Sequence, residues 1–121
     1  AIELSAAAMP LTYLFNAKSN VCEEIMIEGL PLGGLKNEKF TMLKKKFQKG
    51  DVLVMLSDGL PEASNENKEM YDYDRIKELI SKNHFKEPKE IKKEMFESLN
   101  EWINGGVPED DVTLVIVKKV A

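Results

Sequence analysis

A chain of 121 residues, 43% hydrophobic and 31% charged, has the length and composition of one soluble globular domain. Its net charge of −4 gives no indication of a nucleic-acid partner. No apolar stretch approaches the roughly 18 residues that cross a membrane, so we expect no membrane contact from this segment. The single cysteine, Cys22, has no internal disulfide partner, which favours a reducing, cytoplasmic location.

The first half of the chain has the alternation and the turn residues of β-strands. We expect extended segments at residues 4–8, 13–15, 21–28, 40–43 and 52–57. Polar residues 16–20 supply a turn between the second and third segments, and residues 49–51 join the last two, so the pattern predicts an antiparallel meander. The lysines at 44–46 are typical of the solvated end of an edge strand.

In the second half the apolar period becomes helical. Asp74 can cap a first helix, whose apolar positions Ile76, Leu79 and Ile80 follow helical spacing. Pro88 suits the start of a second helix, whose apolar stripe over residues 91–103 we interpret as core packing rather than a partner groove, and Gly105 or Gly106 ends it. A last strand follows at residues 112–117. Strands, two helices and a strand predict an α+β fold with the helices on a sheet face.

Two acidic pairs lie at the ends of apolar strands. Asp58 and Gly59 follow the strand at 52–57, and Asp110 and Asp111 precede the strand at 112–117. If these strands are antiparallel neighbours, both pairs emerge at one edge of a sheet, where carboxylates suit Mg²⁺ or Mn²⁺. A metal-activated water there could attack a phosphoryl group. Asp-Gly and Asp-Asp are also common turn sequences, and the residues alone leave both interpretations open.

Other hydrolytic mechanisms lack the required residues. His84 is the single histidine, and no G-x-S-x-G motif exists to supply a serine nucleophile for it. Two glutamates follow Cys22, where a cysteine-dependent phosphatase needs an arginine, and acidic neighbours would raise the pKa of the thiol. Residues 29–36 miss the register of a phosphate-binding P-loop. We expect no catalytic residue beyond metal ligands, and no organic cofactor.

Five segments carry a resemblance to a known family. They are Ser-Ala-Ala-Ala-Met-Pro at 5–10, Gly-Leu-Pro-Leu-Gly at 29–33, Lys-Gly-Asp at 49–51, Ser-Asp-Gly-Leu-Pro-Glu-Ala at 57–63 with Asn65, and Glu-Asp-Asp-Val-Thr-Leu at 109–114. In this order and spacing they resemble the motifs of the metal-dependent PP2C-type serine/threonine phosphatases, in the bacterial SpoIIE/RsbU-like branch. The likeness spans nearly the whole chain.

The resemblance implies a fold and a metal centre. The fold would be an antiparallel β-sandwich flanked by helices (αββα), with residues 1–121 as the C-terminal portion of one phosphatase domain, containing five to six strands and two helices. Asp58 and Asp110 would be metal ligands of a binuclear Mn²⁺ or Mg²⁺ centre. Gly59, which would keep the metal edge open, and Asp111, where relatives often carry asparagine, are supporting candidates. We assign Glu62 and Asn65 a structural role.

This sequence departs from the family pattern in two ways. Ala8 and Asp72 replace glycines, Leu11 a proline and Pro61 a threonine, and all four lie outside the expected ligands. The family also has an earlier aspartate and a Gly-x-Gly-like segment that bridge both metals, and no such stretch precedes Ala1. We therefore expect this chain to hold an incomplete centre and to be inactive alone.

The resemblance implies hydrolysis of phosphoserine or phosphothreonine on a regulatory protein, such as an anti-sigma-factor antagonist. The chain would then be the cytosolic output domain of a larger sensor. The alternative is a truncated or degenerate module, without catalysis, that binds a partner protein. In either case a sheet that lacks neighbouring strands has open edges, through which we expect self-association.

Overall fold

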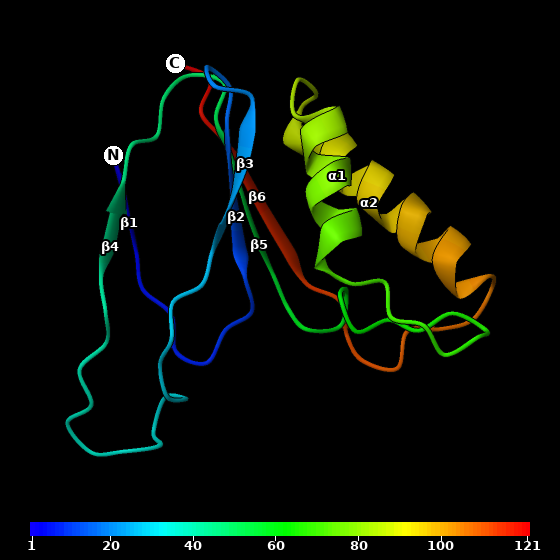
Figure 1. The fold of residues 1–121 in the computed structure, drawn as a ribbon, viewed down its shortest axis with the longest axis horizontal. Helices are drawn as coiled ribbons and strands as arrows, with labels where there is room; N and C mark the ends of the chain where they lie inside the picture. Colours follow the sequence, from blue (N-terminus) through cyan, green and yellow to red (C-terminus); the bar gives the residue numbers. More distant parts are fainter.

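The computed structural model describes residues 1–121 as six strands and two helices, the numbers expected from the sequence (Figure 1). In chain order these are β1 (Ile2–Leu4), β2 (Thr12–Asn16), β3 (Val21–Ile25), β4 (Leu43–Lys45), β5 (Val52–Leu56), α1 (Tyr73–Asn83), α2 (Pro88–Ile103) and β6 (Leu114–Lys118). Neither helix has the length and apolar character needed to cross a membrane.

Three layers make up the structure. A four-stranded antiparallel sheet in the order β3-β2-β5-β6 forms the middle layer, and β1 pairs with β4 in a separate two-stranded sheet. Figure 1 shows α1 and α2 on one face of the larger sheet and the β1–β4 pair beside the opposite face. This arrangement confirms the prediction that helices pack on one face of a sheet.

The two faces of the four-stranded sheet are buried to different extents. Fifteen buried residues form one cluster between the sheet and the helices. Helix α2 contributes a buried stripe at four-residue spacing: Ile91, Met95, Leu99 and Ile103. This stripe confirms that the apolar face of α2 packs in the core. Five buried residues form the second cluster, between the sheet and the β1–β4 pair: Leu14, Ile25, Ile27, Phe47 and Leu53.

The prediction that residues 40–43 and 52–57 form neighbouring strands is wrong. The fourth strand is Leu43–Lys45, and it pairs with β1 in the other sheet, whereas β5 pairs with β2 and β6. Residues 46–51 carry the chain from one layer to the other, and Phe47 is buried in the second cluster on the way. Lysines 44 and 45 lie within β4, where Lys44 is opposite Glu3.

The first strand also differs from the prediction of residues 4–8. It covers Ile2–Leu4, and the chain leaves it for an irregular segment in which Ala8 has a φ of 55°. Asp72 has a φ of 68°. Both residues occupy positions where the family pattern has glycine, and the positive φ explains that preference, because glycine adopts it without a Cβ clash.

Two of the helix ends, the start of α1 and the end of α2, are set by residues other than those expected. Asp72, rather than Asp74, is the N-cap of α1, and its carboxylate accepts a hydrogen bond of 2.7 Å from the backbone N–H of Tyr73. Asp74 lies in the first turn, where a negative charge interacts favourably with the helix dipole. Helix α2 begins at Pro88 as predicted, but Asn104 ends it in a left-handed conformation, ahead of the two glycines.

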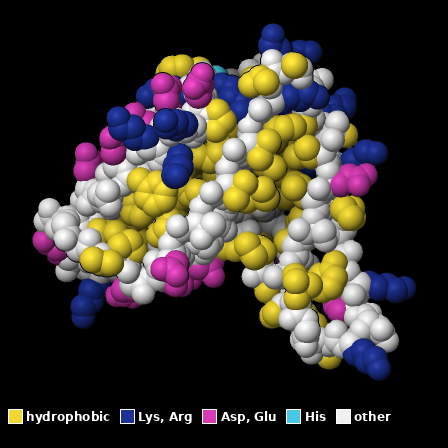
Figure 2. Space-filling model, turned by 180° about the vertical axis from the view of Figure 1, so that it is seen from behind, with side chains coloured by type: hydrophobic (Ala, Val, Ile, Leu, Met, Phe, Trp, Pro, Cys, Tyr) yellow, Lys and Arg dark blue, Asp and Glu magenta, His cyan; other side chains and the backbone are white.

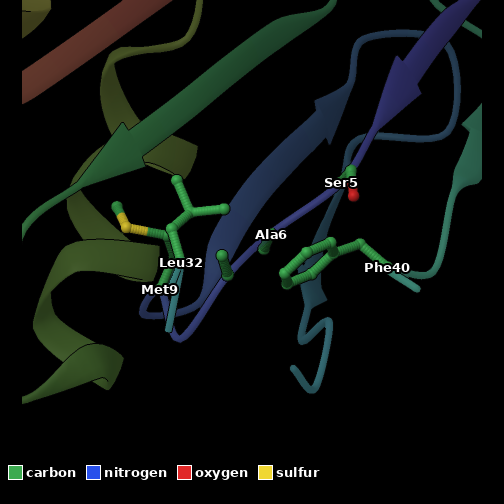
Figure 3. Close-up of a pocket in the computed structure, with 6 residues that line it drawn as sticks. Ser5, Ala6, Met9, Leu32 and Phe40 are labelled. Carbon is green, nitrogen blue, oxygen red and sulfur yellow. The ribbon is translucent and has the colours of Figure 1, made fainter. Parts of the chain in front are cut away.

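Residues 26–42, between β3 and β4, have no regular structure, and after the buried Ile27 they form a long projecting loop. Leu32 is 80% exposed and Leu35 is 61% exposed, and Figure 2 shows hydrophobic side chains along this projection. At its base an apolar pocket of about 360 Å³ is lined by Met9, Leu32 and Phe40 together with residues 5–7 (Figure 3). The loop therefore presents apolar side chains to solvent on the side of the molecule away from the helices.

Candidate metal centre

The edge formed by the end of β5 and the start of β6 brings the two acidic pairs together. The β5–β6 ladder ends at Leu56 opposite Leu114. Beyond this pair, the backbone N–H of Ser57 donates to the carbonyl oxygen of Thr113 at 3.0 Å. The two strands are thus antiparallel neighbours, as the sequence analysis required, and the segments that carry Asp58 and Asp110 leave the sheet at the same edge.

Gly59 packs directly against the second acidic pair. A Cβ placed on Gly59 would lie 2.1 Å from the carbonyl oxygen of Asp111 and 3.2 Å from that of Asp110. Any side chain at position 59 would push the two segments apart, because both neighbours are backbone atoms. Close packing therefore requires a glycine at position 59, in addition to the requirement set by the turn.

The carboxylates at this edge are largely free of protein partners. Asp58 is exposed, and its side chain accepts no hydrogen bond from the protein; only its carbonyl oxygen is bonded, to the backbone N–H of Glu62 at 3.1 Å. Asp110 is exposed, and one carboxylate oxygen accepts the adjacent Asp111 N–H at 2.8 Å. The remaining carboxylate lone pairs of Asp58, Asp110 and Asp111 face solvent and are available to a cation.

Negative charge collects around the first turn of α1 as well. The pKa of Tyr73 is raised, first by burial and then by the carboxylates of Asp58, Glu62 and Asp72. A phenol with the ordinary pKa of 10.0 is already protonated at neutral pH, and the upward shift only strengthens this, so Tyr73 adds no negative charge to this region. The three carboxylates that repel the phenolate form would attract a cation for the same electrostatic reason.

A cavity of about 300 Å³ lies beside Gly59, lined also by Glu62, Ala63, Glu109 and Asp110. Its donors are carboxylate oxygens, the ligands that Mg²⁺ and Mn²⁺ prefer. Asp58 is not among its lining residues, and no three Asp, Glu, His or Cys side chains are grouped closely enough to hold a metal ion. The donor chemistry would suit a hard divalent cation, but the carboxylates gathered here are too few to hold one by themselves.

Two residues near this edge have structural roles. The side chain of Asn65 accepts hydrogen bonds of 2.9 Å from the backbone N–H groups of Asn67 and Glu69, so it shapes its own turn, as expected. Ser57 belongs to the motif at 57–63, but the sequence alone assigns it no role of its own, although a hydroxyl residue between a strand and an aspartate is a recognisable signal. Its side chain bonds to the segment that carries the second acidic pair.

Comparison with known proteins gives a consistent result. The family model described as Stage II sporulation protein E (SpoIIE) matches residues 1–120. The phosphoserine phosphatase RsbU of Bacillus subtilis is 25% identical over 107 residues, which cover 88% of this chain and 31% of RsbU. Protein IcfG of Synechocystis is 29% identical over 89 residues, which cover 74% of this chain and 14% of IcfG. The chain therefore spans less than a third of the length of either relative.

Solved structures show the same fold. The PP2C phosphatase domain of SpoIIE from Bacillus subtilis, solved with a fragment of its regulatory domain, superposes with a TM-score of 0.77 at 20% identity, over 96% of this chain and 33% of that structure. The SiaA PP2C domain of Pseudomonas aeruginosa gives a TM-score of 0.74 at 17% identity, over 98% of this chain and 46% of that structure. The predicted fold class, an antiparallel β-sandwich flanked by helices and present here in part, is confirmed.

Proposed function

The chain belongs to the SpoIIE family, as a SpoIIE/RsbU-like part of a PP2C phosphatase, and from this premise we propose that it contributes to a metal-dependent phosphoprotein phosphatase. The observation that carries the proposal is the shared edge of β5 and β6, where Asp58 and Asp110 leave the sheet together with carboxylate oxygens open to solvent. The use of Mn²⁺ is supported by an Mn-presoaked structure of the SpoIIE phosphatase domain from Bacillus subtilis.

In this proposal Asp58 and Asp110 hold the metal ions. Mn²⁺ or Mg²⁺, when bound, would supply Lewis acidity and activate a water for attack on phosphorus. Gly59 allows the segment after β5 to pack on the backbone of Asp110 and Asp111, which keeps the two ligand-bearing segments in contact. No protein nucleophile is needed, in keeping with the absence of a serine, cysteine or histidine nucleophile motif in the sequence.

The proposed substrate is phosphoserine or phosphothreonine on a regulatory protein. The support comes from RsbU, which is named as a phosphoserine phosphatase. Within the SpoIIE/RsbU-like branch, an anti-sigma-factor antagonist is the kind of protein that we propose as partner. Such a partner is cytoplasmic, so the same location is proposed for this chain.

A second candidate function is a non-catalytic binding module. It is favoured by the incomplete ligand group and by exposed apolar residues on the outer strand β6, where Val115 is 46% exposed and Val117 is 41% exposed. Strands β3 and β6 are the outer strands of the larger sheet, so self-association through them is part of this hypothesis. A clean monomer in size-exclusion chromatography would contradict self-association.

The two functions are separated by an assay of this chain and of the whole gene product that carries it. Each is assayed with p-nitrophenyl phosphate and Mn²⁺, as wild type, Asp58→Asn and Asp110→Asn. Glu97→Gln is the matched control, because it removes an exposed carboxylate from α2. We expect turnover by the whole gene product, its loss in both aspartate variants, and no change in the control. Turnover that survives Asp58→Asn would overturn the metal assignment, and no turnover by either wild type would favour the binding module.

A further inference from the structure

We propose that Ser57 is a positioning residue of the metal edge. Its hydroxyl group would hold the segment that carries Asp110 and Asp111 in a fixed place relative to the segment that carries Asp58. This role rests on the proposed metal-dependent function, since it acts through the two ligand-bearing segments. No contact of Ser57 with substrate or metal is required.

The Ser57 hydroxyl acts as both donor and acceptor of hydrogen bonds across the edge. The hydroxyl oxygen accepts a hydrogen bond from the backbone N–H of Thr113 at 2.9 Å, and the hydroxyl donates to the carbonyl oxygen of Asp111 at 3.2 Å. The backbone N–H of Ser57 adds a third hydrogen bond, to the carbonyl oxygen of Thr113 at 3.0 Å. One residue therefore joins the end of β5 to two residues of the opposite segment.

These bonds replace the ladder where it stops. Regular pairing of β5 and β6 ends at Leu56 opposite Leu114, and the chain after Ser57 turns, with the N–H of Glu62 donating to the carbonyl oxygen of Asp58 at 3.1 Å. No backbone hydrogen bond between the segments is found beyond Ser57. The relative position of the two acidic pairs consequently depends on the Ser57 side chain and on packing.

The Asp111 peptide is held from two directions. Its carbonyl oxygen accepts the Ser57 hydroxyl, and the same oxygen would be 2.1 Å from a Cβ on Gly59. The hydrogen bond pulls the peptide toward β5, and the packing on Gly59 limits how close it can come. Without the hydroxyl the close contact remains but the attraction is lost, so we expect the segment at 110–111 to move away from Asp58.

The principal test measures Mn²⁺ affinity in the whole gene product by titration calorimetry, so it needs no turnover. Ser57→Ala should weaken binding by about tenfold, the size of effect seen when groups that orient metal ligands are removed. Ser57→Thr keeps the hydroxyl, and its Mn²⁺ affinity should lie within about twofold of the wild-type affinity. Ser98→Ala is the control, because it also loses a side-chain hydroxyl bond, to Tyr71, but at a position in α2.

A metal-free measurement checks the bridge itself. Hydrogen exchange followed by mass spectrometry should show faster exchange of the peptide containing Thr113 in Ser57→Ala, because the N–H of Thr113 loses the Ser57 hydroxyl as acceptor. In Ser57→Thr and Ser98→Ala the same peptide should exchange at the wild-type rate. Unchanged exchange in Ser57→Ala would overturn the bridge.

The results distinguish this role from the proposed function. If wild type binds Mn²⁺ and Ser57→Ala binds it equally well, or if Ser98→Ala weakens binding as much, the positioning role is overturned while the function stands. If wild type binds no Mn²⁺, or if Asp58→Asn binds it as tightly as wild type, the metal assignment fails and the positioning role fails with it.

Discussion

Strand β5 has an aspartate near each end, and the two have opposite surroundings. Asp51, immediately before the strand, is 2% exposed, and its two carboxylate oxygens accept hydrogen bonds from the backbone N–H groups of Ala17 at 2.9 Å and Gln48 at 2.8 Å. Asp58, two residues after the strand, is exposed, and its carboxylate accepts no hydrogen bond from the protein. The same residue type on one strand is part of the scaffold at one end and free at the other.

The difference shows how a scaffold aspartate can be told from a candidate ligand. At the Asp51 end, backbone bonds between Gly50, Asp51 and Lys119 tie the loop to the last strand, and both oxygens of the buried carboxylate are hydrogen-bonded to the backbone. At the Asp58 end the strand pairing stops and the side chains point into solvent. A buried carboxylate needs its hydrogen bonds to be stable, whereas an exposed one can exchange water for a metal ion.

The largest expected effect comes from removing the scaffold aspartate. Asp51→Ala leaves the N–H groups of Ala17 and Gln48 without acceptors and should lower the free energy of unfolding by about 2–4 kcal/mol. The matched variant Asp58→Ala should change it by about 0.5 kcal/mol or less, because that side chain has no protein partner. Urea unfolding measures both, and equal losses would contradict the comparison.

The second effect tests the packing at the open end. Gly59→Ala places a methyl group against the backbone of Asp111 and should cost about 1–3 kcal/mol through overpacking. Gly34→Ala is the control, since its Cβ would lie 3.1 Å from the nearest atom, the carbonyl oxygen of Pro31, in an exposed loop. The close approach at Gly59 would be refuted if both variants unfolded at the same urea concentration as wild type.

The third effect concerns a tether at the Asp51 end. The Nζ atom of Lys118, on β6, donates to the carbonyl oxygens of His84 at 2.8 Å and Lys86 at 2.9 Å, so it joins the loop between the helices to the sheet. Lys118→Met keeps the apolar stem and should cost about 1–2 kcal/mol in unfolding free energy. Lys119→Met is the control, because only the backbone of Lys119 is hydrogen-bonded. Equal unfolding midpoints for Lys118→Met and Lys119→Met would argue against a stabilising role of the Lys118 hydrogen bonds.

The smallest effect is a dependence on pH at the same end. His84 stacks on Phe15 with ring centroids 4.2 Å apart, and its pKa is lowered, first by burial and then by the positive charge of Lys118. The folded state favours neutral His84. The contribution of His84 to the free energy of unfolding is therefore complete above the ordinary pKa of 6.5 and is lost as the pH falls toward the lower pKa of the folded state. The difference between the unfolding midpoints at pH 7.5 and pH 5 should be smaller in His84→Gln than in wild type. If the two proteins show the same difference, His84 is not the source of the pH dependence.

Local sequence patterns were sufficient for the existence of the two helices and of β2, β3, β5 and β6, and for the position of both acidic pairs. These features depend on residue periodicity and turn chemistry within a few positions of the chain. The bounds of two of these strands differ most from the prediction: β3 ends at Ile25 rather than at residue 28, and β6 begins at Leu114 rather than at residue 112. The expectation that Asp58 and Asp110 share an edge needed one further assumption, antiparallel pairing of β5 with β6, and the structure confirms it.

Tertiary structure decided what local patterns leave open. The pairing of β4 with β1, the burial of Asp51 and the hydrogen bonds of Ser57 to Asp111 and Thr113 all join residues far apart in the chain. Alternation in a strand indicates which side chains share a face, but not which strand lies beside it, because that choice depends on long-range packing. For the same reason the sequence identified Asp58 as a candidate ligand, and only the fold showed that it is free while Asp51 is not.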